Sequence, residues 1–278
     1  MRINRKLIAA SASFAFIAAL CGPAFAAPPT VPVDQTVGQI NILSGNGGGG
    51  ANTAAAINNA FENASGNIGA NIAAGDSNQQ ANSAYIDGPT SPAYNYTGTF
   101  LQGTLGAASV FSGLNKATVQ NNAFRNASGN VGANIASGAQ NMQDNALAVL
   151  ENVTNVSDTV GQGQAFTISL ASGGNNAEAM NNAFQNAKGN IGLNLAAGSL
   201  NQQSNSAVVM NLSSAADGDL GSVTSTIGQI SAVTVNILSG GNNADVRNNA
   251  FQNASGNIGA NVASGIGNQQ ANVLVVEP

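Results

Sequence analysis

One segment of 25 residues occurs four times along this chain of 278 residues. The copies span residues 58–82, 121–145, 181–205 and 248–272, and they share the frame N-N-A-F-x-N-A-x-G-N-[IV]-G-x-N-[ILV]-A-x-G-x-x-N-x-Q-x-N. A short unit of this kind cannot bury its apolar side chains alone, and stacking on a neighbouring copy solves that problem. The repetition therefore predicts a stack of similar units.

The middle of each copy alternates between apolar side chains and small or amide side chains. In the last copy Ile258, Ala260 and Val262 alternate with Gly259 and Asn261, and a period of two is typical of a strand. We predict an all-β fold, a repeat-based β-solenoid or cross-β stack of short strands with flexible linkers. Glycines expected to end the strand, in a conformation costly for other residues, are Gly75, Gly138, Gly198 and Gly265.

Helix is the competing interpretation of the start of each unit. Residues 51–64 place Ala54, Ile57, Ala60 and Phe61 at a spacing that could form one or two amphipathic turns. Asparagine is a poor helix former and the flanking glycines are poorer, so the composition favours strand.

The copies divide the chain into a regular series of segments. Between them the sequence is richer in Thr, Ser, Val and Asp and varies, which is typical of linkers or looser turns. Ser112-Gly113 and Ser137-Gly138 lie 25 residues apart, and this spacing suggests two related turns of backbone in each unit. The expected segments are a signal peptide (1–26), an N-terminal strand and Gly-rich loop (27–57), repeats at 58–86, 121–150, 181–210 and 248–278, and linkers at 87–120, 151–180 and 211–247.

Stacking of in-register strands would place equivalent side chains about 4.8 Å apart, where identical amides form hydrogen-bonded ladders. The expected structural ladders are Asn71, Asn134, Asn194 and Asn261, and Gln80, Gln143, Gln203 and Gln270. Four phenylalanines would form an aromatic column or simply fill the core, namely Phe61, Phe124, Phe184 and Phe251.

The N-terminus has the pattern of a secretory signal peptide. Basic residues precede an apolar run from Leu7 to Leu20, and the sequence Ala24-Phe25-Ala26 is typical of a cleavage site, although Cys21 leaves a lipoprotein as an alternative. Cleavage after Ala26 would leave four of the seven basic residues against all twelve acidic ones, a net charge of −8. That charge excludes nucleic acid as an expected partner, and we expect no membrane span in the mature chain.

The repeated positions carry no catalytic chemistry. They hold Asn, Gln, Gly, Ala and Phe, the chain has no histidine, and its one cysteine lies in the expected signal peptide. We therefore expect no enzyme activity, no catalytic residue, no cofactor and no metal site. An enzymatic alternative, polysaccharide cleavage by paired carboxylates, depends on Asp217 with Asp219, or on Asp76 with Asp87.

The repeat frame resembles that of Fap-type functional amyloid subunits, which are secreted proteins of biofilm fibrils. The resemblance covers the four copies and the order of signal peptide and repeats. It implies that the copies form the ordered core of a homopolymer, that related fibril subunits and an outer-membrane secretion pore are partners, and that assembly occurs outside the cell. The chain departs from the family pattern by lacking a Cys-x-x-Cys near its C-terminus and by having four copies instead of three.

The leading hypothesis is therefore a secreted structural protein that self-assembles into amyloid-like fibrils supporting biofilm matrix or adhesion. No Lys-rich or Pro-rich edge follows the last copy, so the sequence predicts open ends that add to one another. The alternative is a monomeric β-solenoid adhesin at the cell surface, whose ligand contacts would come from the variable segments, including Tyr85, Tyr94 and Tyr96.

Overall fold

The computed structural model describes residues 33–48, 51–75, 78–86, 94–212 and 222–276, and this part of the chain is all strand and turn, as predicted. The strands are β1 (Val33–Gly48), β2 (Asn52–Ala56), β3 (Ser65–Ala74), β4 (Gln79–Ile86), β5 (Tyr94–Ser112), β6 (Asn115–Gln120), β7 (Ser128–Ser137), β8 (Met142–Ser172), β9 (Asn175–Met180), β10 (Lys188–Ser199), β11 (Gln202–Leu212), β12 (Ser222–Ser239), β13 (Asn242–Val246), β14 (Ile258–Ile266) and β15 (Gln269–Val276). The expected signal peptide lies outside the described residues.

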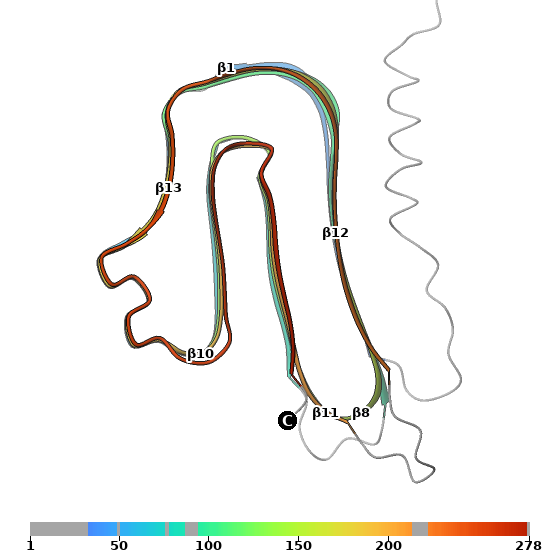
Figure 1. The fold of residues 1–278 in the computed structure, drawn as a ribbon. Helices are drawn as coiled ribbons and strands as arrows, with labels where there is room; N and C mark the ends of the chain where they lie inside the picture. The colour runs from blue at the N-terminus through green and yellow to red at the C-terminus, as the bar shows by residue number, and fades with distance from the viewer. Residues whose placement is uncertain (1–32, 49–50, 76–77, 87–93, 213–221, 277–278) are drawn as a thin grey trace, which may run out of the picture.

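The strands form four rungs, each one layer of the stack: rung 1 (33–86), rung 2 (94–150), rung 3 (153–212) and rung 4 (222–276). Figure 1 looks along the stack, so that the rungs overlie one another. Each rung draws a wide outer arch, which in rung 4 is β12 followed by β13, and a narrower inner arch nested inside it, which in rung 4 is β14 followed by β15. β8 is continuous from rung 2 into rung 3.

Stacking the rungs creates parallel β-structure on four sides, which we number sheets 1 to 4; sheets 1 and 4 are two parts of one seven-stranded sheet, joined through β8. Sheet 1 contains β1, β5, the second part of β8, and β12, and sheet 2 contains β2, β6, β9 and β13. Sheet 3 contains β3, β7, β10 and β14, and sheet 4 contains β4, the first part of β8, β11 and β15. Every one of these pairings is parallel, and equivalent repeat residues pair directly, as Asn71 does with Asn134 and Asn194 with Asn261. The cross-β stack predicted from the repeats is therefore confirmed.

The segments between the repeat copies form the longest strands instead of looser turns over much of their length. Residues 95–112, 155–172 and 222–239 pair residue by residue in sheet 1, although their sequences differ, and the register shifts between Tyr94 and Asn95. These segments are rich in residues that favour a pleated strand, such as Thr and Val, and each pairs with at least one neighbour that supplies hydrogen bonds. The sequences that vary between units thus still share one backbone path.

Helix is absent from the described residues at the place where the sequence left it open. β2 covers Asn52–Ala56, and a turn follows to Ala64. Nowhere among the described residues is there a helical segment with the length and apolar character needed to cross a membrane.

Two apolar layers flank a polar one. Sheets 2 and 3 enclose an apolar core that includes Phe124, Phe184, Ile135 and Leu193. Sheets 4 and 1 enclose a second apolar region that includes Leu150 and other buried residues, namely Tyr96, Val156 and Met210. The space between sheets 3 and 4, inside the inner arch, is instead filled by amide side chains, and it is here that the sequence-predicted ladders lie.

Candidate functional site

The predicted asparagine ladder runs through the inner arch on sheet 3. The side-chain amide of Asn134 donates to Asn71 Oδ1 at 3.1 Å, that of Asn194 to Asn134 Oδ1 at 2.9 Å, and that of Asn261 to Asn194 Oδ1 at 3.0 Å. Asn134 and Asn194 are fully buried. Every bond in this ladder points from a higher rung to a lower one, because identical side chains one rung apart can repeat a single geometry.

The predicted glutamine ladder lies on sheet 4 and has the opposite polarity. Gln80 donates to Gln143, Gln143 to Gln203, and Gln203 to Gln270, each over 2.8 Å. The same amide nitrogen also reaches across to a backbone oxygen of sheet 3, as Gln203 Nε2 does to Leu195 O at 3.1 Å. The glutamines therefore bind adjacent rungs and also close the inner arch within each rung.

A second asparagine ladder, which the sequence interpretation did not identify, faces the first from sheet 4. Asn205 Nδ2 donates to Asn145 Oδ1 at 2.9 Å along the stack and to Asn194 Oδ1 at 2.9 Å within its own rung. The repeat frame contained the signal, since its final Asn is the same in every copy. The complete ladder is Asn82, Asn145, Asn205 and Asn272.

The two asparagine ladders are offset along the stack, so that each rung of sheet 4 also contacts the next rung of sheet 3. Asn194 Nδ2 donates to the backbone oxygen of Asp144 in the rung below at 2.7 Å. A Cβ placed on Gly192 would lie 2.5 Å from Asn145 Oδ1, also in the rung below. Glycine is therefore required at this position, and interdigitation of this kind locks the register of the whole inner arch.

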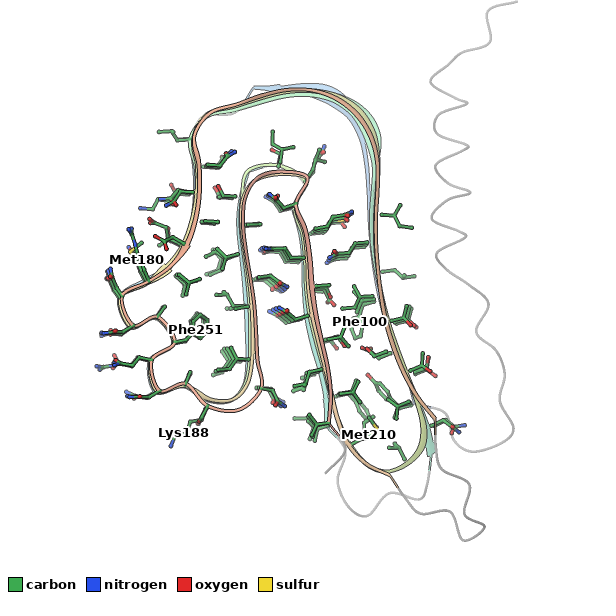
Figure 2. The ribbon with its side chains drawn as sticks, in the orientation of Figure 1. Phe100, Met180, Lys188, Met210 and Phe251 are labelled. Carbon is green, nitrogen blue, oxygen red and sulfur yellow. The ribbon has the colours of Figure 1, made fainter. Side chains whose placement is uncertain are left out.

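The four predicted phenylalanines form one stacked column between sheets 2 and 3. Ring centroids are 4.7 Å apart for Phe61 and Phe124, and 4.8 Å apart for both Phe124 with Phe184 and Phe184 with Phe251. Figure 2 shows Phe251 inside this space, whereas Lys188 points outward. An aromatic pair adds about 0.5–1.5 kcal/mol beyond the area it buries. The column is thus both core filling and a repeated contact along the stack.

Asparagines with positive φ form the turn that ends the outer arch. In rung 3, Asn181, Asn182 and Asn186 have φ of 53°, 63° and 57°, and the equivalent asparagines of the other rungs have similar values. Asparagine tolerates this left-handed region better than other residues with a side chain. The N-N-A-F-x-N part of the frame is therefore a turn signature as well as a source of ladders.

Replacing Asn182 tests this interpretation of the turn. We expect Asn182→Ala to destabilise the stack by about 1 kcal/mol, because alanine is strained at positive φ. Asn182→Gly should be close to neutral, because glycine adopts this conformation readily. The guanidinium concentration that dissolves the assembled chain measures both effects. Equal losses in the two variants would show that the side chain matters and the backbone conformation does not.

The four glycines predicted to end the strand also take positive φ, between 104° and 115°. At three of them an added Cβ would meet a backbone oxygen of the next rung, at 2.2 Å for Gly75, 2.0 Å for Gly138 and 1.9 Å for Gly198. At Gly265, in the last rung, the nearest atom would be Asn242 Nδ2 at 3.1 Å. All four positions therefore need glycine for its conformation, and Gly75, Gly138 and Gly198 need it also because the next rung approaches closely.

The carboxylates singled out for chemistry in the sequence do not form a described site. Asp76, Asp87, Asp217 and Asp219 lie outside the described residues. Across the described ranges no group of three or more His, Cys, Asp or Glu side chains gathers to hold a metal ion. Tyr96, expected to contact a ligand in an adhesin, is instead buried against Tyr85, with ring centroids 5.3 Å apart.

Parallel in-register rungs, amide ladders and a stacked aromatic column define an amyloid-type cross-β protein. The sequence model of the functional amyloid protein FapB/FapC family matches residues 34–210 and again residues 115–278. The functional amyloid subunit FapC of Pseudomonas aeruginosa is 31% identical over 258 residues, covering 80% of this chain and 75% of the relative. The chain belongs to the FapB/FapC family of functional amyloid proteins. No solved structure gives a significant match.

Proposed function

We propose that the chain is secreted and assembles end to end, rung 4 of one copy on rung 1 of the next, into extracellular fibrils that support a biofilm matrix or adhesion. The observation that carries the proposal is the exposure of the two end rungs. Asn134 and Asn194 are fully buried, whereas Asn71 of the same ladder is exposed. Ile191 is 2% exposed, whereas Ile258, its partner in rung 4, is 41% exposed. A further rung would bury these groups as the interior rungs are buried.

The offset between sheets 3 and 4 makes the two ends complementary. Asn272 in rung 4 has no glycine of a further rung beside it, and Gly69 in rung 1 has only its own rung's Asn82 nearby, with Asn82 Cβ 3.5 Å from an added Cβ. In the interior, Asn261 Nδ2 donates to the backbone oxygen of Ser204 in the rung below. Asn71 has the corresponding position in rung 1: its Oδ1 accepts from Asn82 and Asn134, and among the described residues no rung lies below it to accept from its amide nitrogen. One copy's Asn272 would therefore fit against the next copy's Gly69.

Purified residues 27–278 test the assembly directly. We expect fibrils with a meridional reflection at about 4.7–4.8 Å, and seeds that shorten the lag before growth. Two findings support this outcome. The chain belongs to the FapB/FapC family, and the ladder side chains bond to identical side chains of the adjacent rung. A chain that stays monomeric at high concentration would contradict the proposal and favour a monomeric surface adhesin.

Gly69→Ala tests the joint itself. Within one copy the added Cβ meets atoms at ordinary contact distance, so the four-rung fold should persist. At the joint it would meet Asn272 of the neighbouring copy as closely as a Cβ on Gly192 would meet Asn145. Overpacking of this kind costs about 1–3 kcal/mol, so the critical concentration should rise roughly tenfold. Unchanged growth of this variant on wild-type seeds would show that copies do not join in this way.

A further inference from the structure

Asp144 is an acidic side chain in the middle of the stack that the ladders do not use. It follows Gln143 in β8, and because Gln143 and Asn145 both bond toward sheet 3, Asp144 faces sheet 1. Its exposure is 0%, and neither carboxylate oxygen has a hydrogen-bond partner. The same position holds Ala81 in rung 1, and Ser204 and Ala271 in rungs 3 and 4. Rung 2 alone therefore has an ionisable group there.

The neighbouring ionisable and hydroxyl groups give Asp144 no compensating charge. Ser204, its neighbour in rung 3, has a buried hydroxyl that also lacks a partner. Asp158, on sheet 1 of rung 3, is 3% exposed and accepts a hydrogen bond from Ser206. Tyr96, also on sheet 1, is buried and neutral, because burial and the nearby Asp158 raise its pKa. The residue of β5 that pairs with Asp158 is Gly98. Asp34 on β1 pairs instead with Thr97, so Asp34 is not stacked in line with Asp158.

No basic residue of the described chain lies on the two sheets that enclose Asp144. Lys116 is on β6 in sheet 2, and Lys188 is at the start of β10 in sheet 3. Arg125 and Arg247 follow strands of sheet 2, and both pair with acidic residues there, Glu62 and Glu178 respectively. A carboxylate that is buried without a partner or counter-charge becomes neutral by taking up a proton.

We propose that Asp144, with Ser204 beside it and Asp158 nearby, forms a buried proton-binding site that couples assembly of the stack to pH. The site rests on the proposed self-assembly: the rungs of one copy already enclose Asp144, so a chain that folds as it joins the stack takes up the proton at that step. Burial raises the pKa of Asp144 well above its usual range, with a further contribution from Asp158, and burial also raises the pKa of Asp158. A protonated Asp144 supplies one hydroxyl donor, and Ser204 is the adjacent oxygen without a partner.

The direction of the pH effect follows from these raised pKa values. The stacked state binds more protons than the free chain at any pH between the free aspartate pKa of about 3.9 and the raised value. Stability is therefore greatest near the lower end of this window and falls as pH rises through it. Each proton taken up on assembly changes the critical concentration by up to about tenfold per pH unit.

The test is the critical concentration of the mature chain measured from pH 4 to pH 8, together with the protons taken up during growth in weakly buffered solution. For the wild type we expect the critical concentration to rise with pH and growth to consume protons. Asp144→Ala, which installs the residue of rungs 1 and 4, should flatten the slope by up to about tenfold per pH unit and lower proton uptake. Asp144→Asn provides a second neutral variant of similar size, in case alanine leaves a disruptive cavity.

Asp245→Asn is the matched control, because it removes one negative charge from a carboxylate that is 33% exposed and paired with Arg247. It should keep the wild-type slope. If the Asp144 variants keep the wild-type slope of critical concentration against pH, the proton site is overturned. It is also overturned if sodium or calcium ions added at constant pH change the critical concentration as much as the change in pH does. Fibrils indifferent to pH would also overturn it while leaving the proposed function intact. A chain that forms no fibrils at any pH would remove both.

Discussion

Gly198→Ala is expected to abolish assembly at concentrations where the wild type forms fibrils. Gly198 has a φ of 115°, and an added Cβ would lie 1.9 Å from the backbone oxygen of Gly265 in the rung above. Strain at positive φ costs about 1–2 kcal/mol, and overpacking against neighbours costs about 1–3 kcal/mol more. The obstructing atom belongs to the backbone, so no side-chain rotation relieves the contact. Thioflavin fluorescence and the critical concentration measure the loss.

Gly228→Ala is the control for this effect. Gly228 lies in β12, its φ is outside the left-handed range, and the nearest atom to an added Cβ is Val160 O at 4.0 Å. The same chemical change should therefore alter the critical concentration little. Comparable losses in the two variants would mean that alanine acts through the unfolded chain or through growth kinetics, and that close approach of rungs at Gly198 is not the cause.

The parts of the fold that the sequence predicted are those that repeat. Four copies of one frame acted as an internal alignment, so the positions of Asn194 and Gln203 in register followed from the frame, as did Phe184 between sheets 2 and 3. Strand was favoured over helix because asparagine and glycine are poor helix formers, and the all-β fold agrees. Repetition specifies which residues stack.

Repetition does not specify how one rung folds within its own plane. The contact between Asn205 and Asn194 joins two strands of one rung, and no sequence period reports such a pairing. The pairing of β5 with β8 was missed because the variable segments have no shared frame, although the chain path carries them into register. Asp144 was missed for a related reason: one copy alone has it, so comparison of copies set it aside as variation. Contacts within one rung, and the role of a residue present in one copy only, are revealed by the three-dimensional structure.

Asn194→Asp should give the largest loss among the ladder positions at neutral pH. Asn194 is fully buried, and its amide nitrogen donates to Asn134 Oδ1 and to the backbone oxygen of Asp144. A carboxylate would face these oxygens with negative charge and no donor. Leaving a buried charge unpaired costs about 3–5 kcal/mol, so fibrils should be absent at micromolar chain concentration. Burial also raises the pKa of such a carboxyl group, so the loss relative to wild type should shrink in acid.

Asn190→Asp makes the same change four residues earlier on β10, in a ladder at the partly exposed mouth of the inner arch. Asn190 donates to Asn130 at 3.1 Å and accepts from Asn257 at 2.8 Å, so it too loses a ladder bond. Water can solvate the new charge there, and we expect a change of about 0.5 kcal/mol or less. The critical concentration of each variant at pH 4 and pH 7 separates the two positions. If both variants form fibrils equally well at pH 7, the stack tolerates a buried charge at Asn194, where the structure leaves no water to solvate it. Burial of the inner ladder would then not be what holds the rungs together.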